Sequence, residues 1–447
     1  MVRSGVRGWL TSISTKFFTG KRHVCRLLIA GAAGMVLSVL MVTSATAGTG
    51  IISRVSTDVN GAQGNNRSYG SISADGRYVV FSSTASNLVP VDTNSSEDVF
   101  IKDTQSGAIT LLSNDSFGVQ GNYHSNYPSI SADGRYVAFS SDASNLVSGD
   151  SNGFTDIFVR DTLMNTITRV STVSLGAQAN GGSNYPSISA DGRYVTFSSG
   201  AANLVPGDGN VAWDIFIKDT QTDTTTMAST AFGGPQGNNP SNYPSISADG
   251  RYVAFSSSAT NLVSGDGNGF TDVFVKNTLT GAITRVSTAS GGTEGDAASS
   301  NGDMPSISAD GRYVAFSSSA TNLVSGDSNN NSDVFVKDTL TNNTTRISTA
   351  SGGAQANSSS QSPTISADGN YVAFDSAANN LVSGDGNSLP DVFVKDVRTG
   401  VTTRVSIASG GAEGTGGYSF RPSISADGRY VVFSSTASGC RRQQQRG

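Results

Sequence analysis

The chain has 447 residues, of which 36% are hydrophobic and only 14% are charged, and it contains 52 glycines. This composition excludes a coiled coil or a charged helical bundle and favours a β-rich protein with many turns. The formal net charge is −5, and it falls to −11 without the six basic residues among the first 26. Nucleic acid and anionic lipid surfaces are therefore not expected as partners.

The N-terminal segment has the layout of a signal peptide. Residues 1–26 are basic, Leu27 to Val42 form an apolar run, and small residues lead up to Ala47. The apolar run is shorter than the roughly 18 to 20 residues that a membrane-spanning helix needs. We predict that residues 1–47 are a signal peptide cleaved after Ala47. The mature chain is then exported to the periplasm or the extracellular space, without stable membrane insertion. An uncleaved membrane anchor is the alternative.

The rest of the chain is one unit repeated seven times. Each copy contains Ser-Ala-Asp-Gly, and its aspartate recurs 58 to 61 residues apart at Asp75, Asp133, Asp191, Asp249, Asp310, Asp368 and Asp427. In each copy, short β-prone runs flank the Asp-Gly turn signal, and a second pair such as 272–276 and 283–287 follows it. Four strands per repeat predict an all-β, seven-bladed propeller of four-stranded blades over residues 48–438.

Phenylalanines mark the second and third strands of the repeat. We expect these side chains to pack in the core between blades rather than to stack on a ligand. They are Phe81, Phe139, Phe197, Phe255, Phe316, Phe374 and Phe433 on the second strands, and Phe100, Phe158, Phe216, Phe274, Phe335 and Phe393 on the third.

The repeat also resembles that of a known family. Pro-Ser-Ile-Ser-Ala-Asp-Gly-Arg-Tyr-Val-Ala-Phe, followed by Asp-Val-Phe-Val-Lys-Asp and Thr-Arg-Val-Ser, is similar to the WD-like repeat of TolB-type propellers, over residues 51–438. The additional α/β domain that precedes the propeller of TolB has no counterpart here. The resemblance implies an exported propeller. TolB-like propellers serve as interaction platforms, as peptidase gating domains and occasionally as sugar lyases.

The last blade is expected to be incomplete. Ile52 to Ser56 matches the fourth strand of the repeat and is the natural N-terminal closing strand for blade seven. The seventh copy departs from the pattern after Ser438, into an aberrant tail at 439–447, before any third strand. One interpretation is a sequence truncated or frame-shifted near its end. The other is an open ring that forms an edge-paired dimer instead of a monomer.

Between the second and third strands, each complete copy carries Asp-x-Asn-x-x-x-Asp. Three side-chain oxygens at this spacing are similar to those of a Ca²⁺ loop, although no carboxylate follows at the distance needed to close the shell. Asp and Asn also set turns by hydrogen bonding to their own backbone, so calcium binding and turn formation both remain open. The candidate metal residues are Asp92, Asn94, Asp98, Asp150, Asn152, Asp156, Asp208, Asn210, Asp214, Asp266, Asn268, Asp272, Asp327, Asn329, Asp333, Asp385, Asn387 and Asp391.

The sequence offers little for catalysis. His124 is the only histidine after the leader, and neither a nucleophile elbow nor a Cys/His zinc cluster occurs. We therefore predict no catalytic residues and a non-enzymatic platform for a protein or polysaccharide, bound at a rim formed by variable linkers such as 176–184, 233–242 and 291–303. The alternative is a carbohydrate-active enzyme, a glycosidase or lyase, that uses Asp carboxylates at the central channel. An ionisable residue in one blade, where the others carry Ser or apolar residues, favours that enzyme.

Overall fold

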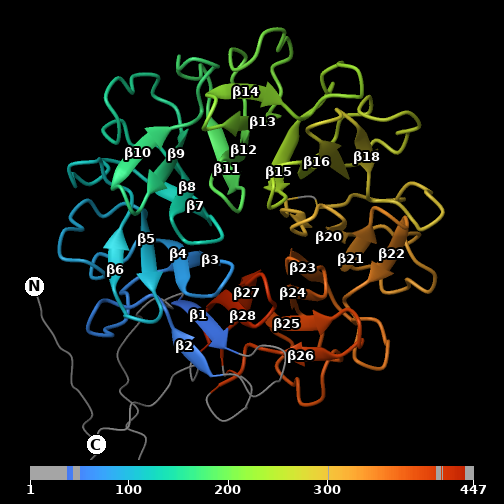
Figure 1. Cartoon of the computed structure of the whole chain (residues 1–447). Coiled ribbons are helices and arrows are strands. Elements are labelled where there is room, and N and C mark those ends of the chain that lie inside the picture. The colour runs from blue at the N-terminus through green and yellow to red at the C-terminus, as the bar shows by residue number, and fades with distance from the viewer. Residues whose placement is uncertain (1–37, 44–50, 301, 409–413, 415, 438–447) are drawn as a thin grey trace, which may run out of the picture. The chain divides into compact units, whose positions relative to one another are not determined.

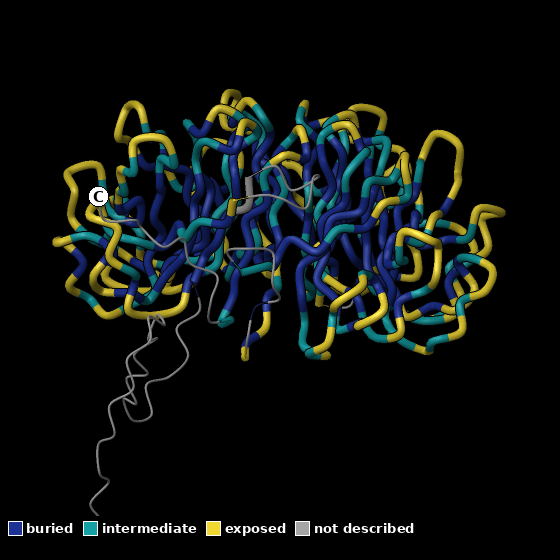
Figure 2. The backbone as a smooth tube through the Cα atoms, turned by 90° about the horizontal axis from the view of Figure 1, so that it is seen from below, coloured by how far each residue is buried: buried dark blue, intermediate teal, exposed yellow. Residues whose placement is uncertain are grey.

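The computed structural model describes residues 38–43, 51–300, 302–408, 414 and 416–437. These residues form 28 strands in seven four-stranded antiparallel sheets. Figure 1 shows the sheets arranged around a common centre, and in Figure 2 the exposed residues lie mainly in the connecting loops. Within these ranges no helix is long and apolar enough to cross a membrane. The predicted all-β, seven-bladed propeller is confirmed.

Each blade runs outward from an innermost to an outermost strand (Figure 1). The innermost strands are β3 (Ser68–Ile72), β7 (Ser125–Ile130), β11 (Ser183–Ile188), β15 (Ser241–Ile246), β19 (Ser306–Ile307), β23 (Ser360–Ile365) and β27 (Ser419–Ile424). The second strands are β4 (Tyr78–Ser83), β8 (Tyr136–Ser141), β12 (Tyr194–Ser199), β16 (Tyr252–Ser257), β20 (Tyr313–Ser318), β24 (Tyr371–Ser376) and β28 (Tyr430–Ser435). The third are β5 (Asp98–Asp103), β9 (Asp156–Asp161), β13 (Asp214–Asp219), β17 (Asp272–Asn277), β21 (Asp333–Asp338), β25 (Asp391–Asp396) and β1 (Ser38–Thr43). The outermost are β6 (Ile109–Leu111), β10 (Thr166–Arg169), β14 (Thr224–Met227), β18 (Ile283–Arg285), β22 (Asn343–Arg346), β26 (Thr402–Arg404) and β2 (Ile52–Arg54).

The hydrophobic core lies between neighbouring blades. Phe139 and Phe158 are stacked in blade two with ring centroids 6.0 Å apart, and Val80 and Val99 of blade one belong to the same cluster. All 13 recurring phenylalanines are at most 1% exposed, so their predicted core role is confirmed. Because each cluster draws on two blades, no blade can bury its apolar faces alone.

The Ser-Ala-Asp-Gly segment is a turn, as predicted. In blade two, Asp133 Oδ1 accepts hydrogen bonds from the hydroxyl of Ser131 at 2.7 Å and from the backbone N–H of Arg135 at 3.0 Å. Gly134 has φ +78°, and a Cβ there would lie 2.2 Å from a ring carbon of Tyr78 in blade one. Glycine is therefore required both by the turn conformation and by the contact with the preceding blade.

Blade seven is complete, which corrects the prediction that it lacks a third strand. β1 pairs with β28 through Leu40 and Phe433, and with β2 through Leu40 and Arg54. Val39 and Met41 pack in the cluster shared with blade one, while Leu40 packs toward blade six. The short apolar run that reads as a leader therefore also fills a strand that is buried on both faces.

The closing strand predicted at residues 52–56 is confirmed as β2 (Ile52–Arg54) at the outer edge of blade seven. It neither dangles nor borrows a partner from another chain, because β1 lies beside it. The basic segment 1–26, the cleavage site at Ala47 and the tail 439–447 all fall outside the described residues.

Candidate functional site

Each Asp-x-Asn-x-x-x-Asp loop brings its two aspartates together at the start of the third strand. In blade one, Asp98 is fully buried, and the Ser113 hydroxyl donates to its Oδ1 at 2.5 Å. Gln120 Nε2, from the linker that follows the outermost strand, donates to Asp98 Oδ2 at 2.8 Å and to Asp92 Oδ1 at 3.0 Å. The loop, the outermost strand and the linker thus meet at one carboxylate pair.

The asparagine of each loop forms the turn. Asn94 Oδ1 accepts the backbone N–H of Ser96 at 2.8 Å, and its Nδ2 donates to the carbonyl of Gly121 at 2.7 Å. In the other five loops the Oδ1 atom of the equivalent asparagine likewise accepts the backbone N–H of the residue two positions later; these acceptors are Asn152, Asn210, Asn268, Asn329 and Asn387. The structure therefore brings together the two aspartates of each predicted trio and uses the asparagine oxygen in an Asx turn.

In four blades an arginine from the outermost strand lies between the two aspartates. Arg169 Nη1 is 3.0 Å from Asp150 and 3.6 Å from Asp156. The same contacts recur at Arg285 with Asp266 and Asp272, Arg346 with Asp327 and Asp333, and Arg404 with Asp385 and Asp391. In these loops a guanidinium supplies the positive charge that a bound cation would otherwise provide.

Blades one and three have no such arginine, because Leu111 and Met227 stand in its place. Gln236 Nε2 donates to Asp208 at 2.6 Å and to Asp214 at 2.8 Å, as Gln120 does in blade one. Burial raises the pKa of Asp98 to about 6, and the nearby charge of Asp92 adds to the rise. Among the six loops, those of blades one and three therefore have the least positive charge close to their two aspartates.

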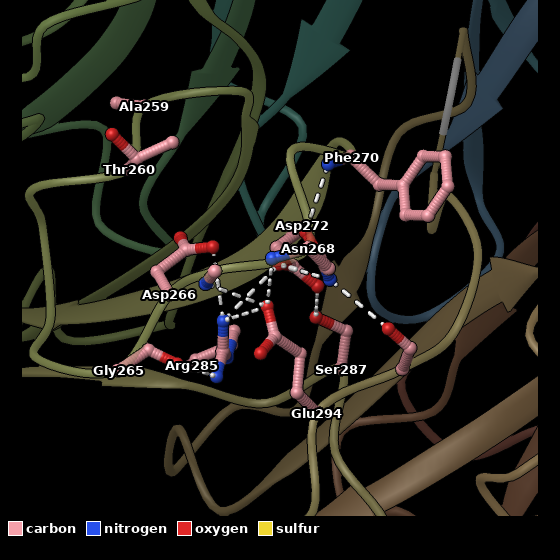
Figure 3. A network of polar contacts seen from close by, with 12 residues as sticks. Ala259, Thr260, Gly265, Asp266, Asn268, Phe270, Asp272, Arg285, Ser287 and Glu294 are labelled. Atoms are coloured by element: carbon pink, nitrogen blue, oxygen red, sulfur yellow. Dashed lines mark hydrogen bonds and ion pairs between the residues drawn. The ribbon is translucent and has the colours of Figure 1, made fainter.

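Blade four adds a third carboxylate. Carboxylate oxygens of Asp266, Asp272 and Glu294 lie within 4.8 Å of one another. Figure 3 shows the Arg285 guanidinium among them, with Nη1 2.9 Å from Glu294 Oε1. Burial raises the pKa of Asp266 to about 6, with the charge of Asp272 as the next cause. The cluster is thus a structural ion-pair network centred on arginine.

The innermost strands form a second group of interest. Tyr127, Tyr185 and Tyr243, from blades two to four, have φ between +51° and +57° at strand bulges. Neighbouring rings in this row are 4.6 Å apart between centroids. Ser362 and Arg421 occupy the corresponding bulges of blades six and seven, also with positive φ. The bulge with positive φ therefore recurs in these innermost strands, while the residue at the bulge changes from tyrosine to serine or arginine.

Two aspartates approach this inner row in blades five and six. Asp375 on β24 is 6% exposed and accepts the backbone N–H of Arg421 at 3.1 Å. Asp303 Oδ2 accepts the N–H of Ser362 at 3.1 Å and the hydroxyl of Ser317 at 2.9 Å. Burial raises the pKa of Asp375 to about 7, and the negative charge of Asp303 contributes to the rise. Neither residue belongs to a motif of the repeat; the signal in the sequence was the 61-residue spacing that contains Asp303.

His124 has a structural contact. It is exposed in the linker before β7, and its Nδ1 accepts the backbone N–H of Glu97 at 2.9 Å. An imidazole that acts as a general base needs a nucleophile within hydrogen-bonding reach. The lone histidine in the described part of the chain is instead engaged by the main chain of a neighbouring loop.

These features define a seven-bladed β-propeller of four-stranded blades. The chain matches no protein-family model and no curated protein. Among solved structures it is similar to TolB from Acinetobacter baumannii, with 15% identity and a TM-score of 0.38, covering 69% of this chain and 62% of that one. A protein assigned as TolB from Agrobacterium tumefaciens gives 15% identity and a TM-score of 0.42, covering 75% of this chain and 96% of that one. The strand topology confirms the predicted seven-bladed propeller, and TolB is among the solved structures to which it is similar.

An oligogalacturonate lyase solved in complex with manganese is also similar, with 13% identity and a TM-score of 0.50, covering 90% of this chain and 96% of that one. At this level of identity the likeness is one of fold. One fold can carry unrelated functions, so the fold alone defines no activity for this chain.

Proposed function

We propose that this protein is an exported, non-enzymatic propeller that binds a protein or polysaccharide partner. The observation that carries the proposal is a series of exposed apolar side chains on successive linkers between blades. Val59, Phe117, Leu175 and Phe232 are 69%, 94%, 91% and 71% exposed. They lie two or three residues after the bridged residue that begins each linker, and large apolar side chains exposed on successive loops are typical of interaction surfaces.

The linker tips are held in place. In the linker after blade one, Asp115 Oδ1 accepts the backbone N–H of Phe117 at 2.9 Å and of Val119 at 2.8 Å. Arg160 of blade two donates to the carbonyl of Asn114 at 2.9 Å. A fixed loop loses little conformational entropy when a partner binds, so these contacts support a preformed surface.

Export is part of the proposal and rests on the layout of residues 1–47. Cleavage after Ala47 would remove β1 and leave β28 and β2 without the strand between them. The exported protein would then have an open edge in blade seven, which supports the edge-paired dimer as its assembly. Retention of β1 would support a monomeric closed ring.

Calcium binding is proposed only for the loops of blades one and three. Asp92 with Asp98, and Asp208 with Asp214, are the pairs without an arginine, and carboxylate oxygens are preferred Ca²⁺ ligands. A ligand that binds only the folded state raises the unfolding midpoint. Thermal unfolding in millimolar CaCl₂ should show this rise, and an unchanged midpoint would discard both sites.

A carbohydrate-active enzyme is the second candidate, and Asp375 is the observation that favours it. The other six second strands carry serine at this position: Ser82, Ser140, Ser198, Ser256, Ser317 and Ser434. When one blade carries an ionisable residue at a position where the other six carry serine, that residue is a candidate for carboxylate catalysis. Release of shortened products from a polysaccharide by the wild-type chain, abolished in Asp375→Ser, would establish this enzyme.

The binding role is tested by capture from envelope and culture-medium fractions. Wild-type chain should retain a specific partner, and the triple variant Phe117→Ser, Leu175→Ser, Phe232→Ser should lose it. The matched control is Leu340→Ser, which removes a side chain that is 75% exposed in the turn between β21 and β22. Equal retention by the triple variant and the wild type would reject the linker surface.

A further inference from the structure

We propose that the inner strands of blades two to seven bind a neutral oligosaccharide, with Asp303, Ser362 and Asp375 contacting its hydroxyl groups and the row of tyrosines stacking on its rings. The proposal extends the binding role above to a named ligand class. It uses a surface separate from the linker tips, so each can fail without the other.

Asp303 and Asp375 both depart from the repeat, and both lie beside Ser362. Asp375 replaces the serine of the other second strands, and Asp303 lies in the three-residue excess between the fourth and fifth copies. They are 72 residues apart in sequence, yet Asp303 contacts Ser362 on β23, the strand that pairs with the β24 strand of Asp375. A repeat that only had to close a ring would need neither carboxylate.

The cluster also contains a hydrogen-bonding group without a partner. Ser300 is 1% exposed, and its hydroxyl has no hydrogen-bond partner among the described residues. Its backbone N–H donates to the carbonyl of Ser317, whose own hydroxyl donates to Asp303. A buried unpaired hydroxyl costs free energy unless a water or ligand satisfies it, so Ser300, like the buried and unpaired Ser140 and Ser198 of blades two and three, offers a hydroxyl that a ligand can satisfy.

The tyrosines provide an aromatic surface on the same inner strands. Tyr127 is 40% exposed, and its ring contacts Tyr185, which in turn contacts Tyr243. The innermost strands of neighbouring blades pack side by side around the centre of the ring (Figure 1). Aromatic rings beside a few fixed polar groups form the usual lining of a small-molecule site, in which the polar groups set orientation.

The negative charge of Asp303 and Asp375 favours neutral over anionic saccharides. Asp303 and Asp375 accept hydrogen bonds from hydroxyl groups, and Arg421 is the cation nearby, with its guanidinium carbon 5.2 Å from the Tyr69 ring centre. A uronic acid unit would bring a further carboxylate toward two aspartates and would be repelled. A neutral sugar offers donors to the carboxylates and apolar ring faces to the tyrosines.

The proposal is tested by titration calorimetry of the full chain with four neutral probes: cellohexaose, maltohexaose, mannohexaose and laminarihexaose. Hexagalacturonate is the anionic control. At least one neutral probe should bind, and hexagalacturonate should not. Asp375→Ser, which installs the residue of the other six blades, should weaken binding about tenfold, as expected for removal of a buried hydrogen-bonding group. Tyr185→Ala should also weaken it.

Asp142→Ser is the matched control, because it removes the same charge from an exposed site two residues after Ser140, the equivalent serine of blade two. Its affinity should equal that of the wild type. No binding of any neutral probe, or equal binding by Asp375→Ser and Asp142→Ser, would overturn the proposal. Partner capture through the linker tips would remain intact in that event, whereas failure of capture with retained sugar binding would reject only the linker surface.

Discussion

The backbone N–H of Ala426 donates to the carbonyl of Ala74 at 3.1 Å, joining the last Ser-Ala-Asp-Gly turn to the first. The same bond links every pair of successive turns, at 3.0 to 3.2 Å, through Ala74, Ala132, Ala190, Ala248, Ala309, Ala367 and Ala426. Seven equivalent hydrogen bonds therefore run around the centre without a gap. The ring is closed at its inner turns independently of the outer strand that completes blade seven.

The turn glycines should be far more sensitive to substitution than other glycines with the same backbone angle. Gly192 has φ +76°, and a Cβ there would lie 2.2 Å from a ring carbon of Tyr136. Gly265 has φ +77° and no atom within 4 Å of that position. We expect Gly265→Ala to cost about 1 kcal/mol through backbone conformation and Gly192→Ala about 1–3 kcal/mol more through the clash. Urea unfolding of both variants measures the difference, and equal losses would contradict the proposed contact.

Removing an arginine from a carboxylate pair should destabilise the blade strongly at neutral pH. Arg285→Met installs the side chain that blade three carries at this position, but leaves Asp266 and Asp272 without their cation. Loss of one partner from a buried charge network costs about 3–5 kcal/mol. The loss should shrink at pH 5, because protonation of Asp266 then relieves the repulsion. Met227→Leu, an apolar exchange at the equivalent site, is the control and should cost less than about 1.5 kcal/mol.

Stability should be greatest at mildly acidic pH. The folded-state pKa values of Asp98 and Asp375 are raised to about 6 and about 7. The folded state therefore binds these protons more tightly than the unfolded state, and stability increases as pH falls from 8 through these values. Ion pairs with Arg77 and Arg193 lower the pKa of Asp103 and Asp219 to about 2, and that contribution is lost as pH falls below 4 toward 2. Unfolding midpoints should peak near pH 5.

The variant Asp98→Asn checks the origin of the neutral limb. It should reduce the rise in midpoint between pH 7.5 and pH 5.5, since one of the two titrating carboxyls is gone and only Asp375 remains. A wild-type profile that is flat from pH 8 to pH 5 would show that neither buried carboxyl titrates in this range.

Loss of residues 1–47 should weaken blade seven. Val39, Leu40 and Met41 are buried, and each such side chain contributes about 1.5–3 kcal/mol when shielded from water. A chain that begins at residue 48 should unfold at a lower temperature than the full chain and should associate through the open edge. Sizing and thermal unfolding of both chains test this, and a monomer of unchanged stability would show that β1 contributes nothing.

Sequence was sufficient for the repeat and its core. The Asp-Gly turns, the alternating phenylalanines and the closing strand at Ile52–Arg54 all follow from local patterns, because each depends on residues near one another in the chain. β1 was missed because Ser38–Thr43 lacks the Asp and Phe that mark other third strands, and because the same apolar run satisfies the pattern of a leader.

The candidate sites were harder to predict than the repeat, because they depend on contacts between residues far apart in the sequence. The aspartate pairs could be located from their spacing, but Arg285 and Glu294 reach them from the next strand and linker, so their roles appeared only in three dimensions. The recurrence of Thr-Arg-Val-Ser was the available signal for the arginine. Asp303 and Asp375 belong to different blades, and only the packing of β19, β20, β23 and β24 shows that they share Ser362.

The central claim is that partners bind the linker tips of a rigid propeller, and a hydrogen-exchange footprint tests it most directly. Chain captured with its partner should be compared with free chain by peptide mass spectrometry. We predict slower exchange in 57–63, 114–120, 172–178 and 230–236, which carry the exposed apolar tips. Slower exchange confined to the turns at 103–108 and 161–166, with unchanged linkers, would contradict the claim.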